Sequence, residues 1–575
     1  MSDDGAGGMV VDFKGNPADK SRTGGSRAAV LIAVTELAER VCVMGISMNL
    51  VTYLIGDLHL SSARSANIVT NFMGTLNLLA LLGGFVADAR LGRYLTIAVS
   101  TVITVLGMAL LAASTALPGM RPPPCADGNG GCVAASGGQL AMLFAALYTV
   151  AVGAGGIKAN VSGLGTDQFD KRDPAEEPAA DRFFNRFFFC ISIGSAAAAT
   201  ALVYVQDRVG RGWGYGAPAG VMVAAGAAFV AGTPRYRYRA PEGSPLTVVG
   251  RVLWAAWRNR GMPCPEDPSE LHGFHAAKVI HTDRLRWLDR AAIVDANLAS
   301  DKAVSFPTLT DVEDVKMLTK LLPIWSTCLM FWTVYCQMTT FSVQQASRMD
   351  RHLGSTFVVP PGSLSAVLFL TILLFTSLND HLLVPLARRA TGNPQGLTAL
   401  QRVGAGLAFA VAAMVAAALV EAKRRGAASV DESVVTSAFW LVPQLVLVGA
   451  GEAFAYVGQL QFFIREAPER MKSLCTGLCL ATVAMGFFLS SALVDASPDA
   501  WVRDDLDKGS LDLFYWMLGV LGVLNFLVFL LFSSRHQYKV TANDSAVAAG
   551  TENEEQTAGE EDAMKISVAV NMMDV

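Results

Sequence analysis

Apolar segments of spanning length alternate with polar segments along most of this 575-residue chain. Crossing the hydrocarbon core of a bilayer takes about 20 apolar residues in a helix. Two sets of six such segments lie on either side of a polar stretch. They fall at about 28–55, 65–87, 94–117, 139–160, 183–205 and 213–232, and at about 317–344, 362–387, 401–420, 437–462, 473–495 and 512–533. The pattern predicts an all-α membrane protein with twelve transmembrane helices in two six-helix halves.

The segments between and beyond the spans complete the predicted organisation. We expect the following parts: an N-terminal segment 1–27, a first bundle 28–232, a linker 233–316, a second bundle 317–533 and a disordered acidic tail 534–575. Arginines are frequent in the linker, so by the positive-inside rule the linker and both termini are expected to be cytoplasmic. One predicted outer loop is an exception to the positive-inside rule, because it contains Lys423, Arg424 and Arg425.

One stretch of the linker, LTVVGRVLWAAWRN, alternates apolar and basic residues at helical spacing. Such a helix either lies on the membrane surface or serves as an ordinary amphipathic linker helix. The first 27 residues lack the apolar core of a signal peptide, so the first spanning helix is expected to direct insertion.

Composition agrees with a membrane protein, since 52% of the residues are hydrophobic and 16% are charged. The net charge of −4 comes without any basic block, which argues against a nucleic-acid partner. Among nine cysteines, Cys125 and Cys132 flank a short loop. They can form a disulfide if that loop faces an oxidising compartment, and the sequence leaves this open.

Sorted by depth, five ionisable residues lie away from the ends of the predicted spans, where each charge costs about 2.5 to 3.5 kcal/mol on insertion scales. They are Glu36, Glu39, Arg40, Lys158 and Glu452. The first three, at positions i, i+3 and i+4 of one helix, share a face and should point toward the bundle interior. Arg40 can compensate one carboxylate, while a less compensated one can load and release a proton. The alternative is a purely structural ion-pair network.

Histidine, the usual proton switch, is excluded by position, because all seven histidines fall in predicted loops, in the linker or near helix ends. If protons are coupled to the activity, carboxylates carry them. No HExxH, nucleotide-binding P-loop or convergent Ser/His/Asp set is present, so neither an enzyme nor a metal site is expected.

Two six-helix halves joined by a linker resemble the major facilitator superfamily, whose substrate site lies near the bilayer midplane. The loop GGFVADARLGRYLT, with Gly84, Asp88, Gly92 and Arg93, resembles that superfamily's motif between its second and third helices. Its glycines permit a tight turn, and Asp88 can pair with Arg93 to latch one conformation.

Several motifs in the same order carry a more specific resemblance. ELAER matches an ExxER motif, and GAGGIKANVSGLGTDQFD, RFFNRFFFCISIGS and GAGEAFAYVGQLQFFIREAPERMKS agree further along the chain. From about Ala28 to Tyr538 the sequence is similar to the proton-coupled oligopeptide transporter family. Its plant branch is the nitrate transporter 1/peptide transporter family, and within that branch the sequence looks most like the nitrate and chloride carriers.

The resemblance implies a role for each membrane-embedded charge. Glu36, Glu39 and Arg40 fall on the family's proton-coupling motif. Lys158 and Glu452 fall on an ion pair between the fourth and tenth helices that gates the cavity. A desolvated pair is a sensible gate, because breaking it is costly unless a proton or an anion compensates the charge left behind.

Substrate identity is less clearly indicated. Tyr335 stands where nitrate-selective relatives carry a histidine, so a neutral hydroxyl replaces an ionisable ring. Alternatively, Tyr335 is a packing aromatic without a role in binding the substrate. Thr339 and Tyr456 are further candidate substrate-binding residues. Three hypotheses follow. The protein is a proton-coupled symporter of nitrate and of chloride; or it is a proton-coupled carrier of di- or tripeptides or of another anionic plant metabolite; or it is a sensor that binds nitrate without transporting it.

The remaining expectations concern partners and place. The expected partners are the anion, protons and the lipid bilayer, and no cofactor is expected beyond protons as the coupling ion. Thr96, three residues after Arg93 in RYLT, fits a regulatory site for a basophilic protein kinase, or else is an ordinary helix-start threonine. Composition fits either membrane, and we favour the plasma membrane over the vacuolar membrane.

Overall fold

We describe the protein from a computed structural model of the whole chain. It describes residues 10–538 except 126–131, 171–175, 240–244, 277–280, 294–305, 392–395, 431–435, 469–470, 499, 504–505 and 507. Internal contacts divide the chain into Met1–Phe532 and Ser533–Val575, and everything below concerns the first unit.

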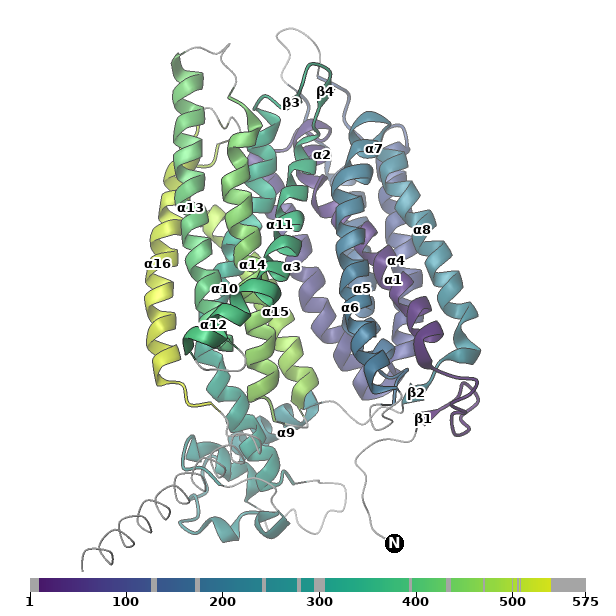
Figure 1. Cartoon of the computed structure of the whole chain (residues 1–575), viewed down its shortest axis with the longest axis vertical. Coiled ribbons are helices and arrows are strands. Elements are labelled where there is room, and N and C mark those ends of the chain that lie inside the picture. Colours follow the sequence, from purple (N-terminus) through teal and green to yellow (C-terminus); the bar gives the residue numbers. More distant parts are fainter. Residues whose placement is uncertain are drawn as a thin grey trace, which may run out of the picture. The chain divides into compact units, whose positions relative to one another are not determined.

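In the first half, every predicted apolar segment is helical (Figure 1). The elements are α1 (Gly25–Ser47) and α2 (Leu50–Gly56); α3 (Ser62–Val86) with η1 (Ala87–Leu91); α4 (Arg93–Ala116); α5 (Gly137–Thr166); α6 (Glu177–Ala197), η2 (Ala198–Leu202) and α7 (Val203–Arg208); and α8 (Arg211–Ala231). Gly92 ends η1 with φ 74° and begins α4, a backbone conformation that glycine adopts at little cost.

The second half repeats the arrangement. Its elements are α10 (Leu309–Ser347); η7 (Pro361–Ser365), α11 (Ala366–Leu378), η8 (Asn379–Leu383) and α12 (Val384–Thr391); α13 (Ala399–Val430); η9 (Ala438–Leu441) and α14 (Val442–Glu466); α15 (Lys472–Ala496); and α16 (Leu511–Arg535). A hairpin of β3 (His352–Leu353) and β4 (Phe357–Val358) follows α10.

Among the described residues, eleven helices are long and apolar enough to cross a membrane. The first predicted span, α1, is not among them, although its 23 residues cover about 34 Å at 1.5 Å per residue. Its sequence holds Glu36, Glu39 and Arg40 within five positions, which lowers its hydropathy. Because α1 packs against α5, α6 and α8, those charges are enclosed by protein.

One predicted boundary is wrong. The span predicted at 401–420 continues as a helix to Val430, so Lys423, Arg424 and Arg425 lie in α13 and not in a loop. Arg424 is buried and its Nε lies 2.8 Å from Glu421 Oε2, while Arg425 pairs with Asp512. Acidic side chains match the charges of these two arginines, and the ammonium of Lys423 lies over the ring of Trp440, so all three basic residues have protein partners at this end of the bundle.

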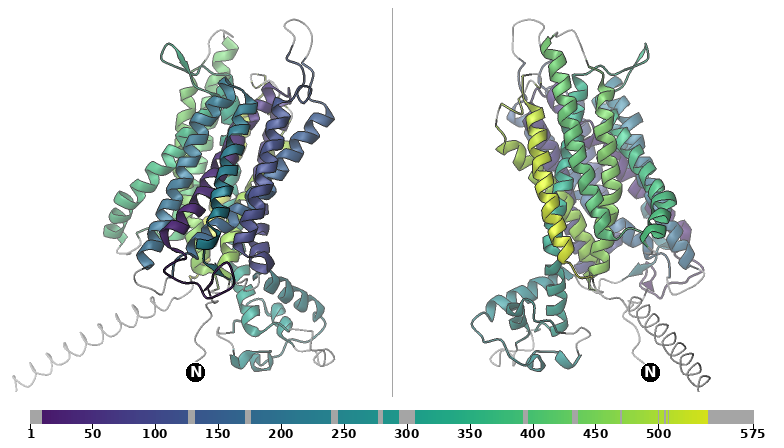
Figure 2. Two further views of the ribbon diagram at one scale, coloured as in Figure 1. Left: turned by 90° about the vertical axis from the view of Figure 1, so that its right-hand side faces the viewer. Right: turned by 60° about the vertical axis from the view of Figure 1, so that its left-hand side comes forward.

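The linker forms a folded group of elements at one end of the bundle (Figures 1 and 2). It contains α9 (Pro245–Arg258), which includes most of the predicted amphipathic helix, and the short turns η3 (Thr233–Arg235), η4 (Pro268–Glu270), η5 (Phe274–Ala276) and η6 (Arg286–Ala292). β1 (Val10–Val11), from the predicted N-terminal segment, pairs antiparallel with β2 (Tyr238–Arg239).

A buried charge cluster fixes the linker to the start of α10, which begins at Leu309 inside the predicted linker. Lys316 Nζ lies 2.7 Å from Asp289 Oδ1 and 2.8 Å from Glu313 Oε1, and His281 Nε2 lies 3.2 Å from Asp289 Oδ2. The three charged side chains of this cluster are each at most 3% exposed.

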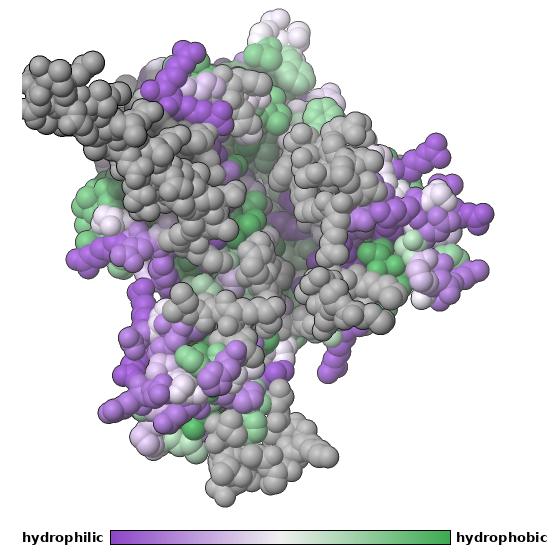
Figure 3. All heavy atoms as spheres, turned by 60° about the horizontal axis from the view of Figure 1, so that its bottom comes forward, coloured by the Kyte–Doolittle hydropathy of each residue, from purple (hydrophilic) through white to green (hydrophobic). Residues whose placement is uncertain are grey.

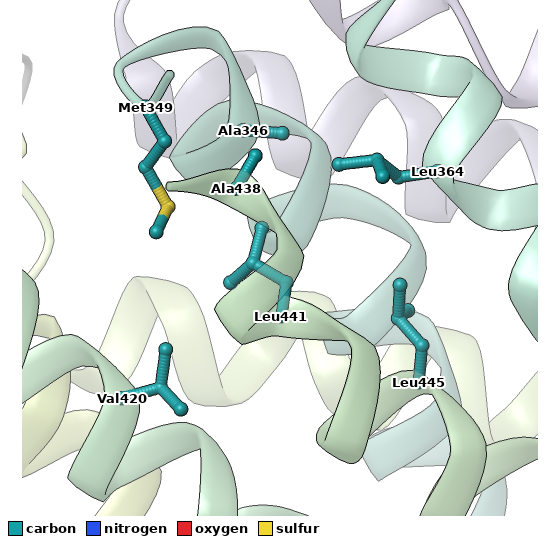
Figure 4. Close-up of a cluster of buried hydrophobic side chains, with 7 residues drawn as sticks. All are labelled: Ala346, Met349, Leu364, Val420, Ala438, Leu441 and Leu445. Carbon is teal, nitrogen blue, oxygen red and sulfur yellow. The ribbon is translucent and has the colours of Figure 1, made fainter. Parts of the chain in front are cut away.

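The two halves meet at the end away from the linker. Ser62 on α3 hydrogen-bonds Gln344 on α10, and Asn67 Nδ2 donates to Asp495 Oδ1 at 2.6 Å. Apolar side chains reinforce this end, since Met48, Ala199 and Val203 pack with Met44, Ala366 and Phe369. A second apolar cluster ties together elements of the second half (Figure 4): Ala346, Met349, Leu364, Val420, Ala438, Leu441 and Leu445.

At the linker end the halves leave a cavity of about 180 Å³. Its walls come from α3, α5, α15 and the start of α9, and Figure 3, which looks at this end, shows the surface hollowed between the halves. The conformation is therefore closed away from the linker and open beside it.

Candidate functional site

The charged face of α1 is enclosed as the helical spacing predicts. Arg40 Nε donates to Glu36 Oε1 at 2.9 Å and lies 3.4 Å from Glu39 Oε2. The side chains of Glu36 and Glu39 are 1% and 0% exposed, and that of Arg40 is 12% exposed. The guanidinium of Arg40 thus forms ion pairs with two buried carboxylates.

The two carboxylates are not equally satisfied. Glu36 accepts the hydrogen bond from Arg40, whereas within the described part of the chain neither carboxylate oxygen of Glu39 has a hydrogen-bond partner. An ionised carboxylate buried without hydrogen bonds is costly, and a proton removes that cost. Glu39 is therefore the member of the trio best suited to bind a proton.

Lys158 on α5 has a partner that the sequence analysis missed. Its Nζ donates to Asn77 Oδ1 on α3 at 2.7 Å, and Asn77 is 1% exposed, with its Nδ2 donating to the Met73 carbonyl at 2.8 Å. This Asn77 lies in an apolar run and is uncharged, so a search for charges passes over it.

Glu452 on α14 belongs to the other half. Its carboxylate interacts electrostatically with the phenol of Tyr335 on α10, and its Oε2 has no hydrogen-bond partner among the described residues. In that same described set, no ion pair within 4.0 Å joins Lys158 to Glu452. The expected gate pair is thus apart in this conformation, and Lys158 donates to Asn77 instead.

These groups nevertheless form one electrostatic neighbourhood between the halves. Lys158 interacts Coulombically with Glu39 and with Glu452, and Arg40 interacts with Tyr456 and with Glu452. Charges from α1, α5 and α14 therefore act on one another across the interface, where low polarity keeps such interactions strong.

Tyr335 and Thr339 share a small cavity of about 40 Å³, lined largely by methionine, leucine and phenylalanine side chains. The hydroxyl of Thr339 donates to the Cys336 carbonyl at 2.9 Å. Tyr456 is not among the residues that line this cavity. It contacts Trp332, whose ring centroid is 6.0 Å from that of Tyr456 and 5.5 Å from that of Tyr335.

Trp332 is a second residue that sequence reasoning missed. It is 4% exposed, and its Nε1 donates to Gln459 Oε1 at 3.2 Å. A tryptophan in an apolar span is ordinarily core, so no local signal distinguishes it; its role as the contact between Tyr335 and Tyr456 depends on the packing of α10 against α14.

The latch at the start of α4 contains the expected ion pair of Arg93 with Asp88 and a second, closer acidic partner. Arg93 Nη1 lies 2.6 Å from Asp167 Oδ2 at the end of α5, while its distance to Asp88 Oδ1 is 4.0 Å. Asp167 also lies 3.4 Å from Arg239 Nε. The main partner of Arg93 is therefore Asp167, which is part of the GTDQFD motif. Nearby, Thr96 is 5% exposed and its hydroxyl donates to the Gly92 carbonyl at 2.9 Å.

Two groups of residues have the geometry of metal ligands within the described ranges: His59 with Cys125 and Cys132, and His281 with Asp289 and Glu313. Cys125 and Cys132 form a disulfide, which resolves the open question about this pair and occupies their sulfurs. In the second group the ammonium of Lys316 already contacts both carboxylates. Neither group thus presents a free ligand set.

Comparison with known proteins gives one consistent family. The POT family profile matches residues 94–503. Protein NRT1/PTR FAMILY 6.4 of Arabidopsis thaliana is 57% identical over 567 residues, covering 95% of this chain and 96% of the relative. Protein NRT1/PTR FAMILY 6.3 of the same plant is 48% identical, covering 92% of this chain and 94% of the relative.

Solved structures support the same fold at lower identity. An autoinhibited POT family peptide transporter superposes with a TM-score of 0.65 at 22% identity, covering 90% of this chain and 98% of that one. The POT family transporter PepTSo gives 0.66 at 20% identity, covering 88% and 98%. With its helices arranged in two halves, the chain has the major facilitator superfamily fold and belongs to the POT family of membrane transporters, in its NRT1/PTR branch.

Proposed function

We propose that the protein is a proton-coupled symporter that carries nitrate, with chloride as a second substrate, across a plant membrane by alternating access. The observation that carries the coupling is Glu39, a fully buried carboxylate whose oxygens lack hydrogen-bond partners among the described residues. The expected absence of catalysis and of cofactors is part of the same proposal.

The charge balance of the cavity supports coupling. Glu36, Glu39 and Glu452 contribute three negative charges when ionised, and Arg40 and Lys158 contribute two positive charges. One proton neutralises the surplus, and an entering anion calls for another positive charge. Proton and anion binding therefore favour each other in a site of low polarity.

We propose that Lys158 exchanges partners during the cycle. In the conformation open beside the linker its ammonium is held by Asn77; in the opposite conformation it pairs with Glu452, as the family resemblance implies. An ammonium in a low-polarity site needs an acceptor in both states. Asn77 supplies it while the halves are apart, which lowers the cost of opening the gate.

The small cavity at Tyr335 and Thr339 supports a small substrate. Its volume of about 40 Å³ admits an ion of a few atoms, whereas a dipeptide is several times larger. Hydroxyl groups of Ser47, Thr339 and Ser365 stand among its apolar walls, and those of Ser47 and Thr339 must turn away from the Met44 and Cys336 carbonyls to donate to an anion. Tyr335 lacks the charge of a histidine, so we expect weak discrimination between nitrate and chloride.

Orientation and location are also proposals. The arginine-rich linker supports placing it, with both termini, in the cytoplasm, which makes the present conformation the inward-open one. We favour the plasma membrane, where an inward proton gradient can drive uptake.

The test is uptake of labelled nitrate and labelled dipeptide into proteoliposomes with a proton gradient. Glu36→Gln and Glu39→Gln should abolish concentrative nitrate uptake but leave exchange of substrate down its own gradient. Glu266→Gln, an exposed linker acid, is the matched control. Full accumulation by both variants and their double would refute carboxylate coupling. Dipeptide uptake in place of nitrate would overturn the substrate, and nitrate binding without flux would favour a sensor.

A further inference from the structure

The amphipathic helix α9 has two distinct faces. Val252, Ala255 and Ala256 are buried where α9 packs against η6, α10 and α15. The opposite face exposes Leu253, Trp254 and Trp257, of which 43%, 62% and 56% are exposed. These three side chains, one, three and four residues apart, form one stripe on the helix surface. Two tryptophans that are each more than half exposed on one helix face favour an environment less polar than water.

Positive charge borders this apolar stripe. Arg251 and Arg258 are exposed on one flank of the helix, and the guanidinium of Arg260 lies 4.7 Å from the ring centroid of Trp257. The sequence from Pro245 to Pro265 contains no aspartate or glutamate. Arginine guanidinium groups match phosphate oxygens, and tryptophan is suited to the boundary between headgroups and acyl chains.

The position of α9 fits such an environment. α9 packs against the start of α15, whose spanning segment begins at Leu474. Figure 2 shows the linker elements below this end of the bundle and offset to one side. The start of α9, at Pro245 and Leu246, therefore lies beside Leu474 of that spanning helix, and the exposed stripe begins about two helical turns further along α9.

We propose that the face formed by Leu253, Trp254 and Trp257, with Arg251 and Arg258, docks on the bilayer surface and binds anionic lipid headgroups. This lipid-binding face is connected to transport, because Pro245 and Leu246, at the start of the same helix, line the cavity between the halves. Lipid bound to α9 fixes one wall of the opening beside the linker. Anionic lipid thereby favours the conformation open on that side.

The test uses the full chain in nanodiscs of phosphatidylcholine with increasing phosphatidylserine. Tryptophan fluorescence is quenched with lipids brominated near the headgroup, and the signal of Trp254→Phe/Trp257→Phe is subtracted from that of wild type. Each arginine contributes roughly fivefold to association with an anionic surface, so Arg251→Gln or Arg258→Gln should raise the phosphatidylserine fraction for half-maximal quenching by about that factor.

Arg64→Gln, an exposed arginine at the far end, is the matched control and should leave that fraction unchanged. In proteoliposomes, phosphatidylserine should stimulate uptake by wild type and by Arg64→Gln, and stimulate Arg251→Gln/Arg258→Gln less. Quenching of Trp254 and Trp257 by aqueous acrylamide and not by brominated lipid would overturn the proposal. So would the same phosphatidylserine dependence in the α9 variants as in the control. The quenching measurement needs no transport, so its outcome is independent of the substrate assignment.

Discussion

The exchange of Lys158 between two partners can be tested through Asn77. Asn77→Leu removes the amide oxygen that lies 2.7 Å from Lys158 Nζ in the conformation open beside the linker. A hydrogen bond to a charged group is worth about 1.5 to 3 kcal/mol, which corresponds to a roughly 10- to 150-fold shift of the equilibrium between conformations. The shift should favour the conformation in which Lys158 pairs with Glu452. Asn77→Asp should act in the opposite direction, because a carboxylate holds the ammonium more strongly.

The assay follows access to the cavity and transport together. Thr476→Cys places a thiol on an exposed position of the cavity wall, where a membrane-impermeant reagent reports opening. Labelling should slow in the Asn77→Leu background and persist or rise in Asn77→Asp, and both backgrounds should transport slowly because each favours one end state. The buried thiol of Cys475 next to it is inaccessible in this conformation.

A matched asparagine provides the control. Asn525 Nδ2 donates to the Thr327 carbonyl at 2.8 Å on α16, away from the charged site, so Asn525→Leu and Asn525→Asp should leave labelling unchanged. If both Asn77 variants label and transport like wild type, Asn77 is no gate partner. If Lys158→Ala and Glu452→Ala also transport normally, the gate pair itself is refuted, since removing one partner should leave an unpaired charge in a low-polarity site.

Three further predictions concern selectivity, regulation and the linker. Tyr335→His should raise the ratio of nitrate to chloride uptake below about pH 6.5, where the imidazole is charged; Tyr335→Phe is the control, and an unchanged ratio would place selectivity elsewhere. Thr96→Asp should alter uptake kinetics by loosening the packing of α4 on α5, since a phosphate there adds about −1.5 to −2 charge, whereas identical kinetics of Thr96→Ala and Thr96→Asp would leave Thr96 structural. Lys316→Met should destabilise the linker by about 3–5 kcal/mol, because it removes the ammonium that Asp289 and Glu313 share and leaves only the imidazole of His281 beside Asp289; an unshifted thermal unfolding transition would contradict this.

The sequence by itself determined the spans, because crossing a bilayer requires length and apolarity, both of which are local properties. It also determined which residues had to be examined, since charges inside apolar helices stand out wherever they occur. The common face of Glu36, Glu39 and Arg40 follows from helical spacing alone and is found in the structure. The end of α13 was misjudged because its basic residues look like a loop until Glu421 and Asp512 are seen to pair with them.

Only the tertiary structure decided which groups meet. Lys158 and Asn77 are 81 positions apart, and Arg93 and Asp167 are 74 apart, so no local pattern joins them. The same limit applies to Trp332, which links two candidate residues only because α10 packs against α14. In a transporter there is a further reason, because one sequence must provide partners for its buried charges in more than one conformation. A sequence motif identifies the charged residues, but it does not specify which partner each residue has in a given conformation.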